Sequence, residues 1–157
     1  MVIKVVAFDV YGTILASDDY DCSFRPRRGF YESVTKYRAR GQLIVTASDV
    51  PINSQKRDLG STFANWREVS GQDVSLALFD DFFQLVEMPK EFEMIRDCYG
   101  LKLDELFVFG DNYDKDILGA QTAGAKYYHV PEYRIMDRNG KLLPQDTFSF
   151  EGISLDD

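Results

Sequence analysis

The stretch Ile3-Lys4-Val5-Val6-Ala7-Phe8 runs directly into Asp9-Val10-Tyr11-Gly12-Thr13, and it decides the fold. The first six residues are almost continuously apolar, which is typical of a strand that is buried on both faces of a sheet. The polar residues that follow predict a loop at the carboxyl end of that strand. In an open parallel sheet ligands bind at this end of the strands, so Asp9 is the first candidate for a functional residue.

Further short apolar runs alternate with segments of helical periodicity, which indicates a parallel sheet covered by helices. We expect strands at residues 3–8, 43–46, 82–86, 106–109 and 126–130, and helices at residues 27–40, 89–99 and 114–123. Only helix and loop can be predicted for residues 49–79. The expected fold class is therefore α/β, with one three-layer, Rossmann-like parallel sheet between helices and no cap domain.

The length of 157 residues predicts a single domain, because this is an ordinary size for one hydrophobic core. We expect its core to span about residues 2–130, followed by a hairpin at about residues 133–143, where Asn139-Gly140 is a strong turn signal. The tail at residues 145–157 is polar and acidic, and we expect it to be poorly ordered.

Composition excludes several classes of partner. With 18 Lys and Arg against 26 Asp and Glu, the net charge is −8, so nucleic acid is not expected as a bulk partner. No apolar stretch approaches the roughly 18 residues of a membrane span, and the first run is too short for a signal peptide. Cys22 and Cys98 make no disulfide framework, so we expect two free thiols and a cytoplasmic protein.

Polar clusters follow three of the expected strands. They are residues 9–13 after the first strand, 46–49 after the second and 110–116 after the fourth. Carboxylates in close quarters resist ionisation, and a bound divalent cation is the usual way to stabilise them. Asp9 and Asp111 are therefore expected to bind Mg²⁺ together.

The run Phe8-Asp9-Val10-Tyr11-Gly12-Thr13 and the stretch at residues 109–120, in this order on the correct strand ends, resemble the haloacid dehalogenase (HAD) superfamily of hydrolases. The resemblance covers about residues 2–130. It implies that Asp9 is the nucleophile and that Asp111 binds the metal. It further implies that Asp116 supports the metal or the lysine, and that the backbone carbonyl of Tyr11 is a metal ligand.

The same resemblance implies a phosphate-binding group made of Thr46, Ala47 and a lysine. The hydroxyl of Thr46 would bond the transferring group, with Ser48 as the alternative. The superfamily usually shows Lys-Pro at the helix after the third strand, whereas this chain reads Pro89-Lys90. We assign the role to Lys90, with Lys56 as the alternative.

Other polar residues have simpler explanations. Asp114 is expected to cap its helix, where acids are favoured by the helix dipole. The single histidine, His129, is expected to be structural. Arg25, Arg27 and Arg28 could form a basic lip for an anionic substrate, but a solvated flank of the first helix is the preferred interpretation.

One position departs from the phosphatase pattern, because Tyr11 stands where those enzymes carry a second aspartate that protonates the leaving group. An Asp-x-Tyr-Gly-Thr run resembles the 2-haloacid dehalogenases, yet their helical cap is missing here, and the chain resembles the capless type. We therefore expect a Mg²⁺-dependent phosphatase with a weakened acid–base step, acting on a phosphorylated small molecule or macromolecule. The alternatives are a dehalogenase-like hydrolase and a catalytically silent scaffold that binds a phosphorylated ligand or protein. Closure of the site in a homo-oligomer is compatible with each of these.

Overall fold

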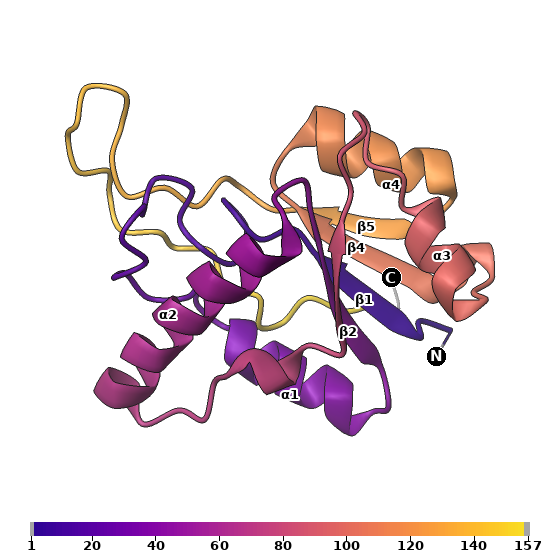
Figure 1. Cartoon of the computed structure of the whole chain (residues 1–157), viewed down its shortest axis with the longest axis horizontal. Coiled ribbons are helices and arrows are strands. Elements are labelled where there is room, and N and C mark those ends of the chain that lie inside the picture. Colours follow the sequence, from indigo (N-terminus) through magenta and orange to yellow (C-terminus); the bar gives the residue numbers. More distant parts are fainter. Residues whose placement is uncertain (1, 156–157) are drawn as a thin grey trace.

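The computed structural model describes residues 2–155 and contains one five-stranded parallel sheet (Figure 1). The strand order is β3-β2-β1-β4-β5. The strands are β1 (Val5–Phe8), β2 (Leu43–Ser48), β3 (Asp81–Gln84), β4 (Leu106–Gly110) and β5 (Lys126–His129). The predicted α/β class is confirmed, and each expected strand is present with small shifts of its ends.

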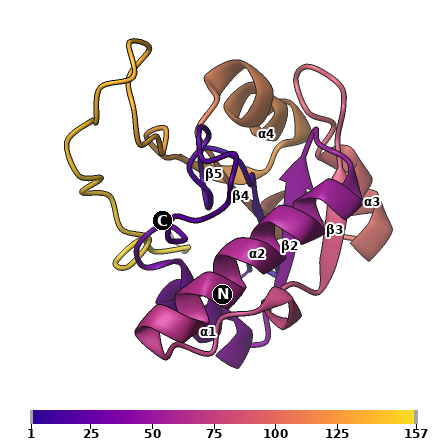
Figure 2. The ribbon, with the colours of Figure 1, turned by 60° about the vertical axis from the view of Figure 1, so that its left-hand side comes forward.

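Helices cover both faces of the sheet, as Figures 1 and 2 show. The helices are α1 (Phe30–Ala39), α2 (Ile52–Ser70), α3 (Glu93–Tyr99) and α4 (Leu118–Ala123). One core layer contains Phe30 of α1 and Phe63 of α2 beneath Phe8, and the other contains Ile95 of α3 and Ala120 of α4. The two layers place α1 and α2 on one side and α3 and α4 on the other, which confirms the three-layer arrangement.

Two helices begin later than predicted. Helix α1 starts at Phe30, not at residue 27, because Gly29 precedes it with a positive φ of 79°. Helix α3 starts at Glu93, not at residue 89. The backbone N–H of Lys90 instead donates to the carbonyl oxygen of Lys115 at 3.0 Å, which ties residue 90 to the loop after β4.

A helix was expected to begin at residue 114, but the chain there forms a turn that is wider than an α-helical one. A π-helical turn, η3 (Tyr113–Ile117), precedes α4 and has two acids, Asp114 and Asp116, in its first turn. Short 3₁₀ turns occur at η1 (Leu76–Leu78) and η2 (Leu103–Glu105). The predicted hairpin is present, because Met136 and Leu142 form an antiparallel bridge.

The expectation of a poorly ordered tail is wrong for the part of it that the structure describes. Phe150 is completely buried and its ring contacts those of Phe8, Phe30 and Phe109. Leu155 is also buried. In Figure 1 this segment (yellow) runs back beneath the sheet on the side of α1. Apolar residues scattered in a polar tail thus complete the core; residues 156–157 lie outside the described part.

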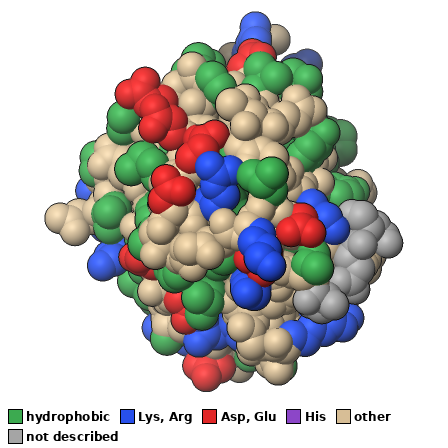
Figure 3. Space-filling view, turned by 90° about the vertical axis from the view of Figure 1, so that its right-hand side faces the viewer, with side chains coloured by type: hydrophobic (Ala, Val, Ile, Leu, Met, Phe, Trp, Pro, Cys, Tyr) green, Lys and Arg blue, Asp and Glu red, His purple; other side chains and the backbone are tan. Residues whose placement is uncertain are grey.

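The surface carries a mixture of charges. On the face drawn in Figure 3, acidic and basic side chains alternate with apolar ones and do not gather into one basic patch. Within residues 2–155, no helix combines the length and apolar character that crossing a membrane requires.

Candidate active site

The site lies at the carboxyl ends of β1, β2 and β4. Phe8, the last residue of β1, pairs with Phe109 of β4, and the backbone N–H of Asp9 donates to the carbonyl oxygen of Phe109 at 2.9 Å. Asp9 follows β1 directly and Asp111 follows β4 directly. Neighbouring parallel strands that end at the same level therefore bring the two carboxylates together.

Lys90 joins this group from the segment before α3. Its ammonium donates to Oδ1 of Asp9 at 2.9 Å, to Oδ1 of Asp116 at 2.5 Å and to the carbonyl oxygen of Ala47 at 2.8 Å. Only 3% of Lys90 is exposed. The three donors of the ammonium are thus fully used, and they link β1, β2 and η3 around one cation.

Thr13 and Gly12 complete the loop after β1. The buried hydroxyl of Thr13 lies 3.2 Å from Oδ2 of Asp9 and 3.1 Å from Oδ1 of Asp111, so it bridges the two acids. Gly12 has a φ of 84°, and a Cβ there would lie 2.4 Å from Oδ2 of Asp111. Thr13 was not assigned a role from the sequence, although it stands in the run that carries the resemblance.

Two acids of this cluster, Asp111 and Asp116, do not ionise readily by themselves. Burial, reinforced by Asp9, raises the pKa of Asp111 to about 8. Burial and Asp9 also raise the pKa of Asp116 to about 6, although Lys90 acts in the opposite direction. Burial disfavours the charge on Lys90, but the attraction of Asp9 and Asp116 outweighs it and raises the pKa of the lysine.

The donor set fits a divalent cation. Asp9, Asp111 and Asp116 each offer a carboxylate oxygen, and these oxygens all lie within 4.8 Å of one another. Three carboxylates and one ammonium leave two negative charges when all are ionised. Hard cations such as Mg²⁺ prefer oxygen ligands of this kind, and a bound cation would offset both the burial and the repulsion that raise the two pKa values.

The side chain of Tyr11 points away from the acids. Its hydroxyl donates to Oδ2 of Asp58 on α2 at 2.5 Å. Burial, followed by the hydrogen bond to Asp58, raises the pKa of Tyr11. A phenol that is tied to a carboxylate and holds its proton this tightly is a poor proton donor for a reaction at Asp9.

The structure does not bring the hydroxyl of Thr46 to this group. That hydroxyl donates to Oε1 of Gln55 at 2.5 Å and accepts the backbone N–H of Phe83 at 3.3 Å. Ser48, the alternative, accepts the N–H of Val50 at 3.1 Å. The second strand instead reaches the cluster through the carbonyl of Ala47, which accepts from Lys90.

Three further sequence candidates, Lys56, Asp114 and His129, add no side chain to the acidic cluster. The ammonium of Lys56, the alternative lysine, is 5.1 Å from the centre of the Phe82 ring. Asp114 is exposed, and it is Asn112 whose side chain caps the turn by accepting the N–H of Lys115. His129 is exposed, and its Nε2 lies 2.9 Å from the carbonyl oxygen of Asp111, which fits a structural role.

The interpretation of Arg27 as part of a solvated flank is wrong. Only 1% of Arg27 is exposed, and its guanidinium binds both carboxylate oxygens of Asp146 at 3.0 and 3.1 Å. A third nitrogen of the guanidinium donates to the carbonyl oxygen of Gly12 at 3.3 Å. Arg27 therefore connects the C-terminal segment to the loop that follows Asp9.

Part of the chain matches a known protein family. Residues 88–132 match the family model described as HAD-hydrolase-like. This segment contains Lys90, Asp111 and Asp116, whereas Asp9 lies outside it. Comparison with curated protein sequences found no match.

Several solved structures share the fold. A predicted phosphoglycolate phosphatase from Haemophilus somnus superimposes with a TM-score of 0.65 at 14% identity, over 85% of this chain and 88% of its own. An uncharacterised protein from Listeria monocytogenes gives 0.60 at 18% identity, over 91% and 88% of the two chains.

A third structure holds a metal. The N-terminal part of a Bacteroides fragilis protein, which contains a phosphatase domain and was solved in complex with Mg, gives a TM-score of 0.58 at 18% identity. The match covers 83% of this chain but only 37% of that one. The chain thus has the fold of the HAD-like hydrolases, and residues 88–132 are a segment typical of them.

Proposed function

We propose that the protein is a Mg²⁺-dependent phosphohydrolase of the HAD type, in which Asp9 is the nucleophile and the acid–base step is weak. The observation that carries the proposal is the group formed by Asp9, Lys90, Asp111 and Asp116 at the ends of adjacent strands. The Mg-bound phosphatase domain from Bacteroides fragilis has the same fold and supports the assignment.

The contacts of Asp9 suit a nucleophile. One carboxylate oxygen accepts from Lys90 and the other from Thr13, so the side chain is held in one orientation. Attack by a carboxylate oxygen on a phosphate monoester forms an acyl phosphate and breaks the bond from phosphorus to the leaving oxygen; water then releases phosphate. A bound Mg²⁺ would supply charge neutralisation for the approaching anion, with Asp9, Asp111, Asp116 and the Tyr11 carbonyl as the proposed ligands.

Proton transfer is the weak step in this proposal. The leaving oxygen needs a proton, and the Tyr11 hydroxyl is bound to Asp58 and has a raised pKa. We therefore expect turnover only for esters whose leaving group departs as an anion. We also propose a capless enzyme, because the crossover between β2 and β3 carries α2 and η1, and residues 9–29 contain no helix or strand.

Hydrolysis of p-nitrophenyl phosphate, whose leaving group needs little protonation, tests the proposed phosphatase activity. We expect Mg²⁺-dependent release of p-nitrophenol that is lost in Asp9→Asn. Asp114→Asn is the matched control, because it removes an exposed carboxylate two residues from Asp116 and should keep the wild-type rate. Turnover that survives in Asp9→Asn would refute the nucleophile.

A variant can restore the second aspartate of the phosphatase pattern at position 11. It tests whether this general acid is the only group that the site lacks. Asp58 accepts the hydroxyl of Tyr11, so Tyr11→Asp alone would remove this donor from Asp58 and add a second negative charge in its neighbourhood. The double variant Tyr11→Asp/Asp58→Asn removes that repulsion. We expect it to hydrolyse alkyl phosphates at least about a hundredfold faster than wild type, the lower range for a general acid.

Two alternative functions keep specific support. The occupied hydroxyls of Tyr11 and Thr46 favour a silent scaffold, for which isothermal titration would show binding of Mg²⁺ and inorganic phosphate without turnover of a phosphoester panel. The Asp-x-Tyr-Gly-Thr run favours a dehalogenase, for which halide would be released from a 2-haloacid without added metal. Either result, with no phosphatase activity in the restored variant, would replace our proposal.

A further inference from the structure

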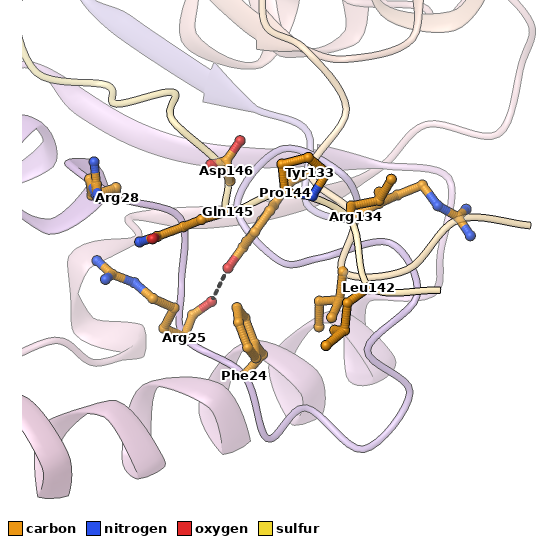
Figure 4. Close-up of a pocket in the computed structure, with 11 residues that line it drawn as sticks. Phe24, Arg25, Arg28, Tyr133, Arg134, Leu142, Pro144, Gln145 and Asp146 are labelled. Carbon is orange, nitrogen blue, oxygen red and sulfur yellow. Dashed lines mark hydrogen bonds between the residues drawn. The ribbon is translucent and has the colours of Figure 1, made fainter. Parts of the chain in front are cut away.

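A cavity of about 280 Å³ lies between the loop that precedes α1 and the segment that follows β5 (Figure 4). It shares no residue with the acidic cluster. Apolar side chains from both segments form much of its wall, among them Phe24, Tyr133, Ile135 and Leu142. A mostly apolar cavity with a few placed polar groups is the usual form of a small-molecule site.

One end of this cavity is positively charged, although the chain as a whole carries a net charge of −8. Arg25 and Arg28 line it, and in Figure 4 the side chain of Gln145 lies between them. Among residues 2–155 neither arginine has a carboxylate oxygen within 4.0 Å. The guanidinium of Arg25 lies 4.6 Å from the centre of the Trp66 ring, and its Nε donates to a backbone carbonyl, which leaves two nitrogens as donors.

The acids around the cavity are already bound. Asp146 lines it, but both of its carboxylate oxygens accept from the buried Arg27. A third arginine of the lining, Arg134, lies 4.0 Å from both Asp18 and Glu132 and is thereby balanced. The uncompensated charge of the cavity is therefore that of Arg25 and Arg28.

Hydrogen bonds hold the backbone of both segments that form the walls. The carboxylate of Asp18 accepts the backbone N–H groups of Ile135 and Met136 at 2.9 and 2.8 Å. The hydroxyl of Tyr133 donates to the carbonyl oxygen of Arg25 at 2.9 Å, drawn as the dashed line in Figure 4. Walls held in this way reduce the entropy lost on binding.

We propose that this cavity binds a small organic anion. Its apolar body packs against Phe24 and Leu142, and its carboxylate, sulfonate or phosphate group is held by Arg25 and Arg28. Guanidinium groups suit this task because their planar set of N–H donors matches the oxygens of such anions. The site is independent of the proposed phosphatase activity.

A pair of fluorescent probes separates the apolar from the ionic part of the proposal. 1-Anilinonaphthalene-8-sulfonate carries the ring system and an anionic group, and N-phenyl-1-naphthylamine carries the same rings without charge. We expect the folded protein to bind the sulfonate at one saturable site, with a Kd about a hundredfold lower than that for the neutral compound, about tenfold for the charged hydrogen bond from each arginine.

Variants locate the binding. Arg25→Gln and Arg28→Gln should each raise the Kd of the sulfonate about tenfold and leave that of the neutral probe unchanged. Phe24→Ser should weaken both probes, because it removes part of the apolar wall. Arg40→Gln, an exposed arginine at the end of α1, is the charge-matched control and should change neither Kd.

Thermal unfolding of each variant checks that the fold is kept, and because both arginines are at least partly exposed, each offers an independent test. No saturable binding of the sulfonate would overturn the proposal. Equal affinity for the two probes, or binding that neither arginine variant weakens, would overturn it as well, since the cavity would then be an apolar hollow without a place for the anion.

Discussion

At the position of Gly12, any side chain would clash with Asp111, a ligand of the proposed metal site. A Cβ at this position would lie 2.4 Å from Oδ2 of Asp111, and the φ of 84° is itself unfavourable for other residues. Gly41 has a similar φ of 86° but open space around it, so the pair separates the two effects.

We expect Gly12→Ala and Gly41→Ala each to lose about 1–2 kcal/mol of unfolding free energy from the left-handed backbone. Gly12→Ala should in addition weaken Mg²⁺ binding by about tenfold or more, because Asp111 must move. Isothermal titration with Mg²⁺ and urea unfolding measure the two quantities. Unchanged Mg²⁺ affinity in Gly12→Ala would contradict the assignment of Asp111.

Lys90 and Lys56 offer a second matched pair, because both were candidates from the sequence. Lys90 is buried against Asp9 and Asp116, so Lys90→Met leaves two buried acids without their cation. We expect a loss of about 3–5 kcal/mol in the metal-free protein, by urea unfolding at neutral pH. Lys56→Met should cost about 1 kcal/mol or less, since that lysine is exposed and lies over the half-buried ring of Phe82. Equal losses would show that Lys90 is not a structural cation of the site.

At the scale of residues, the sequence predicts which residues belong to the site better than it predicts the side of the sheet that each side chain faces. The order of the motifs is enough to select Asp9, Lys90, Asp111 and Asp116, which the structure brings together. It misses the bridge made by Thr13 and places the Thr46 hydroxyl in the site. Successive residues of a strand face opposite sides of a sheet: Ala47 lies in the core layer of α3 and α4, on the side from which Lys90 reaches the cluster. Thr46 is directed to Gln55 of α2.

At the scale of elements, the adjacent ends of β1 and β4 bring carboxylates close together. The stability of the metal-free protein should therefore depend on pH. The pKa values of Asp111 and Asp116 are raised to about 8 and about 6, above their ordinary value of 3.8. Between pH 4 and 8 the folded state therefore holds more protons than the unfolded state, so stability falls as the pH rises.

We expect the unfolding midpoint in urea to decrease from pH 4 toward pH 8 in the presence of a chelator, and the decrease to be smaller with Mg²⁺. Asp111→Asn should flatten the metal-free profile, while Asp114→Asn should leave its shape unchanged. A metal-free profile that rises over this interval would mean that the carboxylates do not repel one another in the folded state.

Strands could be predicted better than the starts of helices. Each buried strand is a short apolar run between polar residues, and this signal is local. The start of α3 is displaced to Glu93 because Lys90 has to enter the site and its N–H donates to Lys115, a contact across 25 residues. Asp116 likewise sits in a π-helical turn, with its N–H donating to the carbonyl of Asn112. No periodic pattern in the sequence records such contacts.

At the scale of the whole molecule, the C-terminal segment is part of the core. Phe150 is fully buried among aromatic rings, whereas Phe24 is 45% exposed. We expect Phe150→Ala to cost about 3–5 kcal/mol of unfolding free energy, and Phe24→Ala about 1 kcal/mol or less. Urea unfolding followed by circular dichroism measures both. A small loss in Phe150→Ala would mean that the segment is not packed in solution.

The order of this segment could not be predicted because its composition is polar and its partners are remote. Arg27 and Asp146 are 119 residues apart, and neither residue alone differs from a solvated surface charge. When each charged residue of the sequence is considered alone, both are expected to be exposed to solvent. Only the folded chain shows that each neutralises the other beside Gly12.

The distance in sequence between Arg27 and Asp146 also sets an order of events during synthesis. At about 5–20 residues per second, a ribosome needs on the order of ten seconds to add the 119 residues that separate them. Throughout that interval the loop carrying Asp9 lacks the contact that joins it, through Arg27, to the segment containing Asp146. The loop that carries the proposed nucleophile therefore gains its contact with Arg27 and Asp146 in full only after Asp146 has been made.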